Sequence, residues 1–310
     1  MGLQFGLAAM GAALRGSGNF KPGMVVQTAT VVLNMALAPV LIFGWLGVPA
    51  LGVGGAALST LVAIIVGTVW LAGYFLRRDA YLRFTPAHWK PRLDLWAKML
   101  RIGLPAGAEF ALMGVYLFVV YSVTRPFGAA AQAGFGIGQR IVQAGFMPIV
   151  ALGFAVAPVA GQAFGARRPD RVRETFRSAA AMATGVMALF ALLSHIAPAA
   201  MVGFFSSDAQ VVAVGDEYLR IISWNYVASG LVFVSASMFQ AMGNTVPSLL
   251  TSLTRILVVA IPSFLLAKLP GFQLRWVWYL SAASVTLQMT VSLLLLRREF
   301  GRRLDTSARA

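Results

Sequence analysis

Long apolar runs alternate with short polar segments along most of the chain. Eight runs are long enough to cross a bilayer as helices, at roughly 24–44, 51–76, 100–124, 131–163, 178–205, 217–242, 247–267 and 275–297. An earlier run, residues 2–14, is too short to cross and lacks the basic start of a signal peptide, so we interpret it as the end of a longer helix. The pattern predicts an all-α polytopic membrane protein.

One connection is both long and polar, and it covers residues 77–99. Its second part carries an apolar stripe, which predicts an interfacial helix with Trp89 and Trp96 at the level of the lipid headgroups. This connection divides the chain into a first lobe (1–78), a cytoplasmic interfacial linker (79–99), a six-helix second lobe (100–300) and a cytoplasmic tail (301–310).

Composition supports a membrane protein and excludes several kinds of site. Hydrophobic residues make up 59% of the chain and charged residues 11%, whereas about 25% is usual for the charged fraction of soluble domains. There is no cysteine, and the two histidines, His88 and His195, lie far apart in the sequence. We therefore expect no metal site and no bound cofactor. No span carries a nucleophile beside a base, so we do not expect an enzyme.

The basic residues fall mainly on one side of the predicted spans. Of the 25 Lys and Arg residues, 19 lie in loops on one side and four on the other, while Arg140 and Arg255 lie within spans. The positive-inside rule places the first side, and with it the C-terminus, in the cytoplasm. Because membrane loops account for the net charge of +15, we expect lipid and small organic molecules as partners and no nucleic acid. We expect a monomer in a bacterial inner membrane.

Glu109 is the only one of the ten acids that falls in the interior of a predicted apolar span, since Glu217 stands at the very start of its span. In a helix starting near residue 100 it would lie about 13 Å from the start, close to the middle of the hydrocarbon layer. An ionised carboxylate there costs a few kcal/mol, so Glu109 must face a cavity or a partner, or take up a proton. Each outcome indicates transport, although a structural hydrogen bond is the alternative.

A short motif occurs twice, as GNFKP at 18–22 and GNTVP at 243–247. Each copy lies between two apolar helices on the same predicted side, which indicates duplicated lobes of the kind found in transporters. By comparison with the second lobe, roughly 125 residues, or about three helices, are expected ahead of the first copy. We therefore expect residues 1–78 to be the remnant of a larger lobe.

Several segments, in order along the chain, resemble the multidrug and toxic compound extrusion (MATE) transporters. They are LRGSGNFKP (14–22), LGVGGAALST (51–60), IGLPAGAE (102–109), GIGQRI (136–141), VAGQAFGARRPDRVRE (159–174) and MFQAMGNTVPS (238–248). The resemblance implies twelve helices in two six-helix lobes, of which this chain would correspond to helices 4 to 12. It also implies a cation-coupled antiporter that exports organic, often cationic, compounds.

The chain departs from the family pattern at positions that bear on the coupling ion. Ala38 stands before Pro39 where many members have an acid, and Met113 stands where others have a glutamate one turn beyond Glu109. Sodium-coupled members often add an acid in helix 10, whereas residues 219–242 contain none. The resemblance therefore favours H⁺ over Na⁺, with Glu109 as the ion-coupling residue.

Other polar and aromatic side chains inside the spans are candidates for lining a cavity, with helix packing as the alternative use. Arg140 lies at a depth that would allow a pair with Glu109, and Arg255 would either line a cavity or extend toward the cytoplasm. The candidates are Asn34, Tyr116, Gln139, Arg140, Gln143, Asn225, Gln240 and Arg255.

Three functions remain open from the sequence. The first is the cation-coupled exporter, for which aromatic and methionine side chains such as Phe110, Phe118 and Trp224 would suit flat organic cations. The second is a flippase for lipid-linked sugars of the same superfamily, which would need a continuous basic cavity. The third is a truncated product that does not transport.

Overall fold

The computed structural model describes residues 2–77 and 92–307, so most of the linker, including Trp89, lies outside the described residues. The chain divides into two compact units, Met1–Leu93 and Asp94–Ala310. The first contains α1 (Gly2–Gly16), α2 (Phe20–Phe43) and α3 (Val53–Arg77). A Cβ on Gly55 would collide with the carbonyl group of Leu41, so the absence of a side chain lets α3 approach the end of α2 closely.

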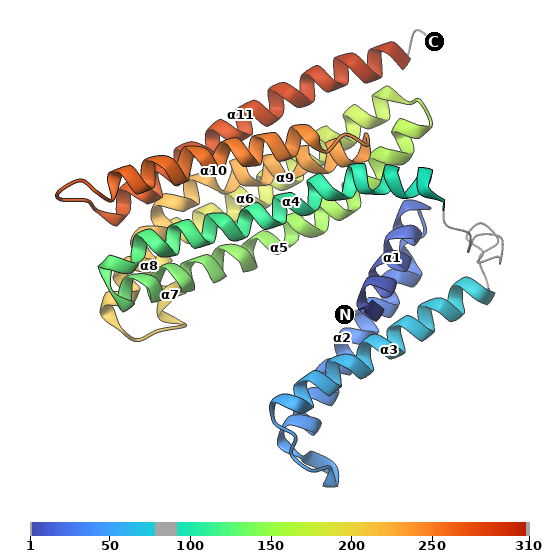
Figure 1. The fold of residues 1–310 in the computed structure, drawn as a ribbon, viewed down its shortest axis with the longest axis horizontal. Helices are drawn as coiled ribbons and strands as arrows, with labels where there is room; N and C mark the ends of the chain where they lie inside the picture. The colour runs from blue at the N-terminus through green and yellow to red at the C-terminus, as the bar shows by residue number, and fades with distance from the viewer. Residues whose placement is uncertain (1, 78–91, 308–310) are drawn as a thin grey trace. The chain divides into compact units, whose positions relative to one another are not determined.

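The second unit is a helical bundle, shown in green to red in Figure 1. Its helices are α4 (Leu93–Thr124), α5 (Ala129–Gly165), α6 (Pro169–Ile196), α7 (Pro198–Gly203), α8 (Ala209–Ile222), α9 (Tyr226–Ala241), α10 (Val246–Leu266) and α11 (Leu274–Ser307). Together α8, a 3₁₀ turn at Ser223–Asn225 and α9 form one long segment. The unit therefore has six segments long and apolar enough to cross a membrane.

Across the described residues, eight segments satisfy the length and hydropathy of a membrane span, which confirms the predicted number and the all-α class. The predicted boundaries need correction. The fourth helix of the chain begins at Leu93 instead of residue 100, and the last continues to Ser307. The predicted span 178–205 ends at Ile196, just before Pro198 starts the short α7. Helices extend past their apolar runs because backbone hydrogen bonding continues into the polar layer, where hydropathy gives no signal.

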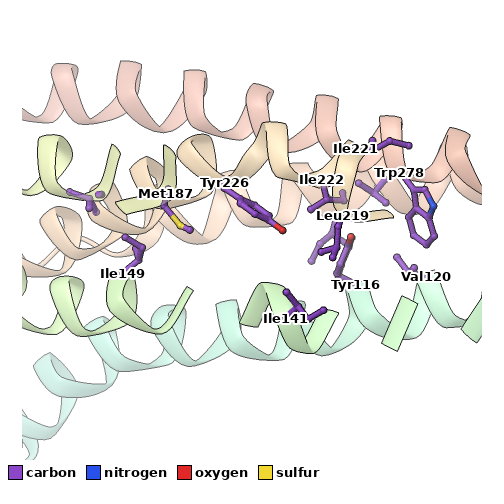
Figure 2. Close-up of a cluster of buried hydrophobic side chains, with 14 of the residues drawn as sticks. Tyr116, Val120, Ile141, Ile149, Met187, Leu219, Ile221, Ile222, Tyr226 and Trp278 are labelled. Atoms are coloured by element: carbon purple, nitrogen blue, oxygen red, sulfur yellow. The ribbon is translucent and has the colours of Figure 1, made fainter. Parts of the chain in front are cut away.

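The core of the second unit centres on aromatic side chains from α5, α8 and α11. The Phe135 ring stacks on Trp278 at 5.4 Å between centroids, and Tyr218 meets the edges of both. All three side chains are almost fully buried. Figure 2 shows Trp278 with Tyr116 and Leu219 in this buried cluster. Helix packing here fixes the positions of the polar groups that lie beside the cluster.

The two copies of the repeated motif form the same turn. Gly18 and Gly243 have φ of 84° and 70°, a conformation that glycine adopts without strain. In each copy the asparagine side chain donates a hydrogen bond to a residue 55 positions later, Asn19 to Tyr74 Oη and Asn244 to Glu299 Oε1. Because the match includes the partner position, the two units share local architecture beyond the five repeated letters.

Candidate functional site

The carboxylate of Glu109 lies at the midpoint of α4 and bonds to α10. The hydroxyls of Ser248 and Ser252 both donate to Oε1 of Glu109, the second at 3.0 Å. Glu109 is half-buried and Ser248 is 4% exposed. Hydrogen bonds donated to an ionised carboxylate are about twice as strong as neutral ones, so these contacts join two helices through one charge.

The network continues from α10 to α11. Gln288 Nε2 donates to Ser252 Oγ at 3.1 Å, and Ser292 Oγ donates to Thr251 Oγ1 at 3.3 Å. Ser248, Thr251 and Ser252 are spaced i, i+3 and i+4, which places them on one face of α10. Sequence reasoning missed this set, although the same spacing in PSLLTSLT at 247–254 was a signal that could have found it.

The carboxyl of Glu109 and the hydroxyls of Ser248 and Ser252 could supply oxygen ligands to a cation, but of these three groups only the carboxyl can carry a charge. Among the described residues, no three His, Asp or Glu side chains come together in a way that could hold a metal ion. The possible pair between Glu109 and Arg140 is not formed in the part of the chain that the structure describes. Serine hydroxyls, which carry no charge, hydrogen-bond to the carboxyl group instead.

Three of the predicted cavity-lining residues lie together in a groove between α4 and α5. Gln139, Arg140 and Gln143 line this groove, which has a volume of about 390 Å³, together with Gln132 and Tyr121. Arg140 is exposed there. Gln139 also accepts a hydrogen bond from the buried Tyr218 hydroxyl at 2.8 Å, which fixes the orientation of its amide. The groove therefore brings several polar side chains together on a largely apolar surface between two membrane-spanning helices.

Tyr116, Asn225 and Arg255 lie in or against the core. Tyr116 is 5% exposed, and its hydroxyl lies 2.9 Å from the hydroxyl of Ser281 on α11. Asn225 is 4% exposed, and its side-chain amide donates to the Ser281 carbonyl at 3.4 Å. The guanidinium carbon of Arg255 lies 5.0 Å from the centroid of the Tyr116 ring, a cation–π contact. These contacts correspond to the helix-packing alternative.

The other two candidates lie apart from this set. Asn34 donates to Thr60 Oγ1 at 3.0 Å and links α2 to α3 in the first unit, while Gln240 is exposed near the end of α9. Of the aromatic side chains proposed for organic cations, Phe110 is 74% exposed and Phe118 71% exposed on α4, and Trp224 is 77% exposed beyond α8.

Comparison with known proteins defines the class. The MatE family model matches residues 105–265, which is more than half of the chain and includes Glu109, Ser248 and Ser252. The chain belongs to the MATE family, and it is a multi-pass membrane protein.

Similar proteins include "Probable multidrug resistance protein YoeA" of Bacillus subtilis, 27% identical over 88% of this chain and 60% of its own length. "Probable multidrug resistance protein NorM" of Thermotoga maritima is 25% identical over 93% of this chain and 62% of its own. The chain thus spans about three fifths of the length of these relatives.

Solved structures agree on the fold. An outward-facing multidrug resistance MATE transporter of the MOP superfamily matches with a TM-score of 0.85 and 25% identity, covering 93% of this chain and 64% of that one. A MATE structure in a bent conformation matches with a TM-score of 0.89 and 23% identity, covering 99% of this chain and 67% of that one.

Proposed function

We propose that this chain forms part of a proton-coupled exporter of organic compounds, in which Glu109 carries the coupling proton. The names of the relatives, which describe multidrug resistance, support export as the activity. The observation that carries the proposal is the hydrogen-bonded carboxyl of Glu109 at the middle of a membrane span. An intramembrane ionisable group of this kind is costly to maintain without a function.

Proton exchange at Glu109 would alter the packing of α4 on α10. The ionised carboxylate accepts hydrogen bonds from Ser248 and Ser252, whereas a protonated carboxyl is itself a donor. A proton on Oε2 leaves Oε1 able to accept both bonds but removes the charge that strengthens them, so protonation weakens both contacts. The proton thus changes the contacts between two helices, which is the coupling an antiporter requires.

A proton fits this site better than Na⁺ does. A sodium site would take several oxygen ligands, and a second carboxylate nearby would strengthen it, yet residues 219–242 contain no acid. The groove between α4 and α5 supplies amide groups and one guanidinium that suit hydrogen bonding to an organic substrate. We propose that residues 100–300 act as one lobe and residues 1–78 belong to the other, in a monomer with a cytoplasmic C-terminus.

The test is Glu109→Gln in the complete transporter of which this chain forms part, purified and reconstituted into proteoliposomes. A pH gradient should drive ethidium efflux from vesicles with the original protein and none from vesicles with the variant, because glutamine cannot exchange a proton. The matched control is Glu174→Gln, which changes an exposed glutamate paired with Arg171 at 3.2 Å and should leave efflux unchanged.

Three results would contradict the proposal. Efflux at the original rate in Glu109→Gln would remove the role of that carboxyl. Efflux driven by a sodium gradient alone would replace the proton with Na⁺. Absence of gradient-driven efflux in the complete transporter, with the protein folded and correctly inserted, would reject export as the activity.

A further inference from the structure

A second groove lies between α6 and α11, away from Glu109. It has a volume of about 440 Å³ and is formed by the early turns of α6 and the late turns of α11. Three arginines and several apolar side chains line it. The residues that matter here are Arg173, Arg177, Arg297, Phe176, Leu296 and Phe300.

The groove has a basic rim and an apolar floor. Arg173 and Arg177 are one helical turn apart on the same face of α6, and Arg297 approaches from α11. The rings of Phe176 and Phe300 meet edge to face at 5.9 Å between centroids and close the floor across the two helices. A ligand that fills this groove must therefore combine an anionic group with an apolar part.

Acids close to the groove already bind other arginines. Glu174 pairs with Arg171 at 3.2 Å, and Glu299, 7% exposed, pairs with Arg303 at 2.6 Å. Within the part of the chain that the structure describes, Arg177 and Arg297 are exposed and form no ion pair. The rim therefore keeps positive charge that an external anion can balance.

The depth of the groove matches a membrane surface. Arg177 directly precedes the apolar part of α6, and Arg297 directly follows the apolar part of α11. The rim thus lies at the predicted level of the headgroups. Leu293 and Leu296 line the groove on the acyl-chain side of Arg297, while Phe176 and Phe300 lie on the polar side of the two arginines. The base distribution predicts that this is the cytoplasmic side, where anionic lipids attract basic residues.

We propose that this groove binds an anionic phospholipid, with the phosphate between Arg177 and Arg297 and an acyl chain along Leu293 and Leu296. Arginine suits this role because its planar guanidinium binds phosphate through two parallel hydrogen bonds. The apolar floor favours binding of a lipid over a free phosphate ion, because the ion has no apolar part to contact the floor. The proposal is independent of transport and of the role of Glu109.

Native mass spectrometry of the full chain in detergent would test the site. Phosphatidylglycerol should bind more tightly than phosphatidylcholine with the same acyl chains. Combining Arg177→Gln with Arg297→Gln should weaken phosphatidylglycerol binding about 25-fold, at about fivefold for each arginine near the surface. The matched control is Arg298→Gln, since Arg298 is an exposed neighbour of Arg297 that does not line the groove. It should leave binding unchanged.

The alternatives give distinct results. Equal binding of the two lipids, unchanged binding in the double variant, or an equal loss with Arg298→Gln would overturn the proposal. If inorganic phosphate displaces the bound lipid as effectively as phosphatidylglycerol does, the groove is a site for a free anion instead. If the double variant does not fold by circular dichroism, Arg177→Lys with Arg297→Lys keeps both charges. Because lysine lacks the planar guanidinium, that variant should bind phosphatidylglycerol more weakly than the original protein does. Its binding of phosphatidylcholine should be unchanged and serves as the reference.

Discussion

Replacing Gly138 by alanine should destabilise the second unit, because the added methyl group would collide with a fixed ring. A Cβ at Gly138 would lie 2.5 Å from Cδ1 of Tyr218, far inside van der Waals contact. The Tyr218 ring is 1% exposed and is held by edge contacts to Phe135 and Trp278 at 5.3 and 4.9 Å between centroids. Its hydroxyl donates to Gln139. Either the ring must move or α5 and α8 must separate.

The expected loss can be estimated from these contacts. Overpacking a filled core costs about 1–3 kcal/mol, and a lost buried hydrogen bond adds about 0.5–1.5 kcal/mol. Alanine regains up to about 1 kcal/mol over glycine in a helix interior. The net loss is about 0.5–3.5 kcal/mol, which corresponds to a fall in melting temperature of roughly 1–14 °C for a unit of this size.

Thermal unfolding in detergent, followed by tryptophan fluorescence, would measure this loss, since Trp278 is buried beside Tyr218. Gly185→Ala is the matched control in α6: nothing lies within 4 Å of the position its Cβ would take, so it should be neutral or slightly stabilising. Tyr218→Phe removes only the hydrogen bond and should cost about 0.5–1.5 kcal/mol. A Gly138→Ala variant as stable as the original protein would refute the packing argument.

Two further predictions concern coupling and orientation. Ser248→Ala should lower pH-driven efflux about tenfold, because the lost bond to the carboxylate is worth about 1.5 kcal/mol. Ser252→Ala should also lower efflux. Normal efflux in both variants would show that the two serines contribute to helix packing and not to coupling. Single cysteines at Arg167 and Arg309 should be labelled only from the cytoplasm and one at Ser207 only from outside. Labelling of all three from one face would exclude the predicted orientation.

The sequence alone determined the class of the protein and the position of one acid well inside an apolar span. Lipid requires each span to be apolar over about 20 residues and to satisfy its backbone internally, so the number of spans follows from hydropathy. The same requirement makes one carboxylate in such a run conspicuous, which is why Glu109 could be named without a structure. The repeated turn was also visible, because Gly18 and Gly243 meet a conformational demand that few other residues satisfy.

Only the tertiary structure decided which side chains meet. Ser248 and Ser252 contact Glu109 from more than 130 positions away, and Gln288 extends the network from a third helix. Tyr116 is buried in the core, whereas Phe110 and Phe118 on the same helix are exposed. Hydropathy cannot separate these outcomes, since lipid is as apolar as a leucine side chain and helix faces toward lipid and toward protein look alike. Shape and hydrogen bonding choose between them, and both depend on residues distant in the chain.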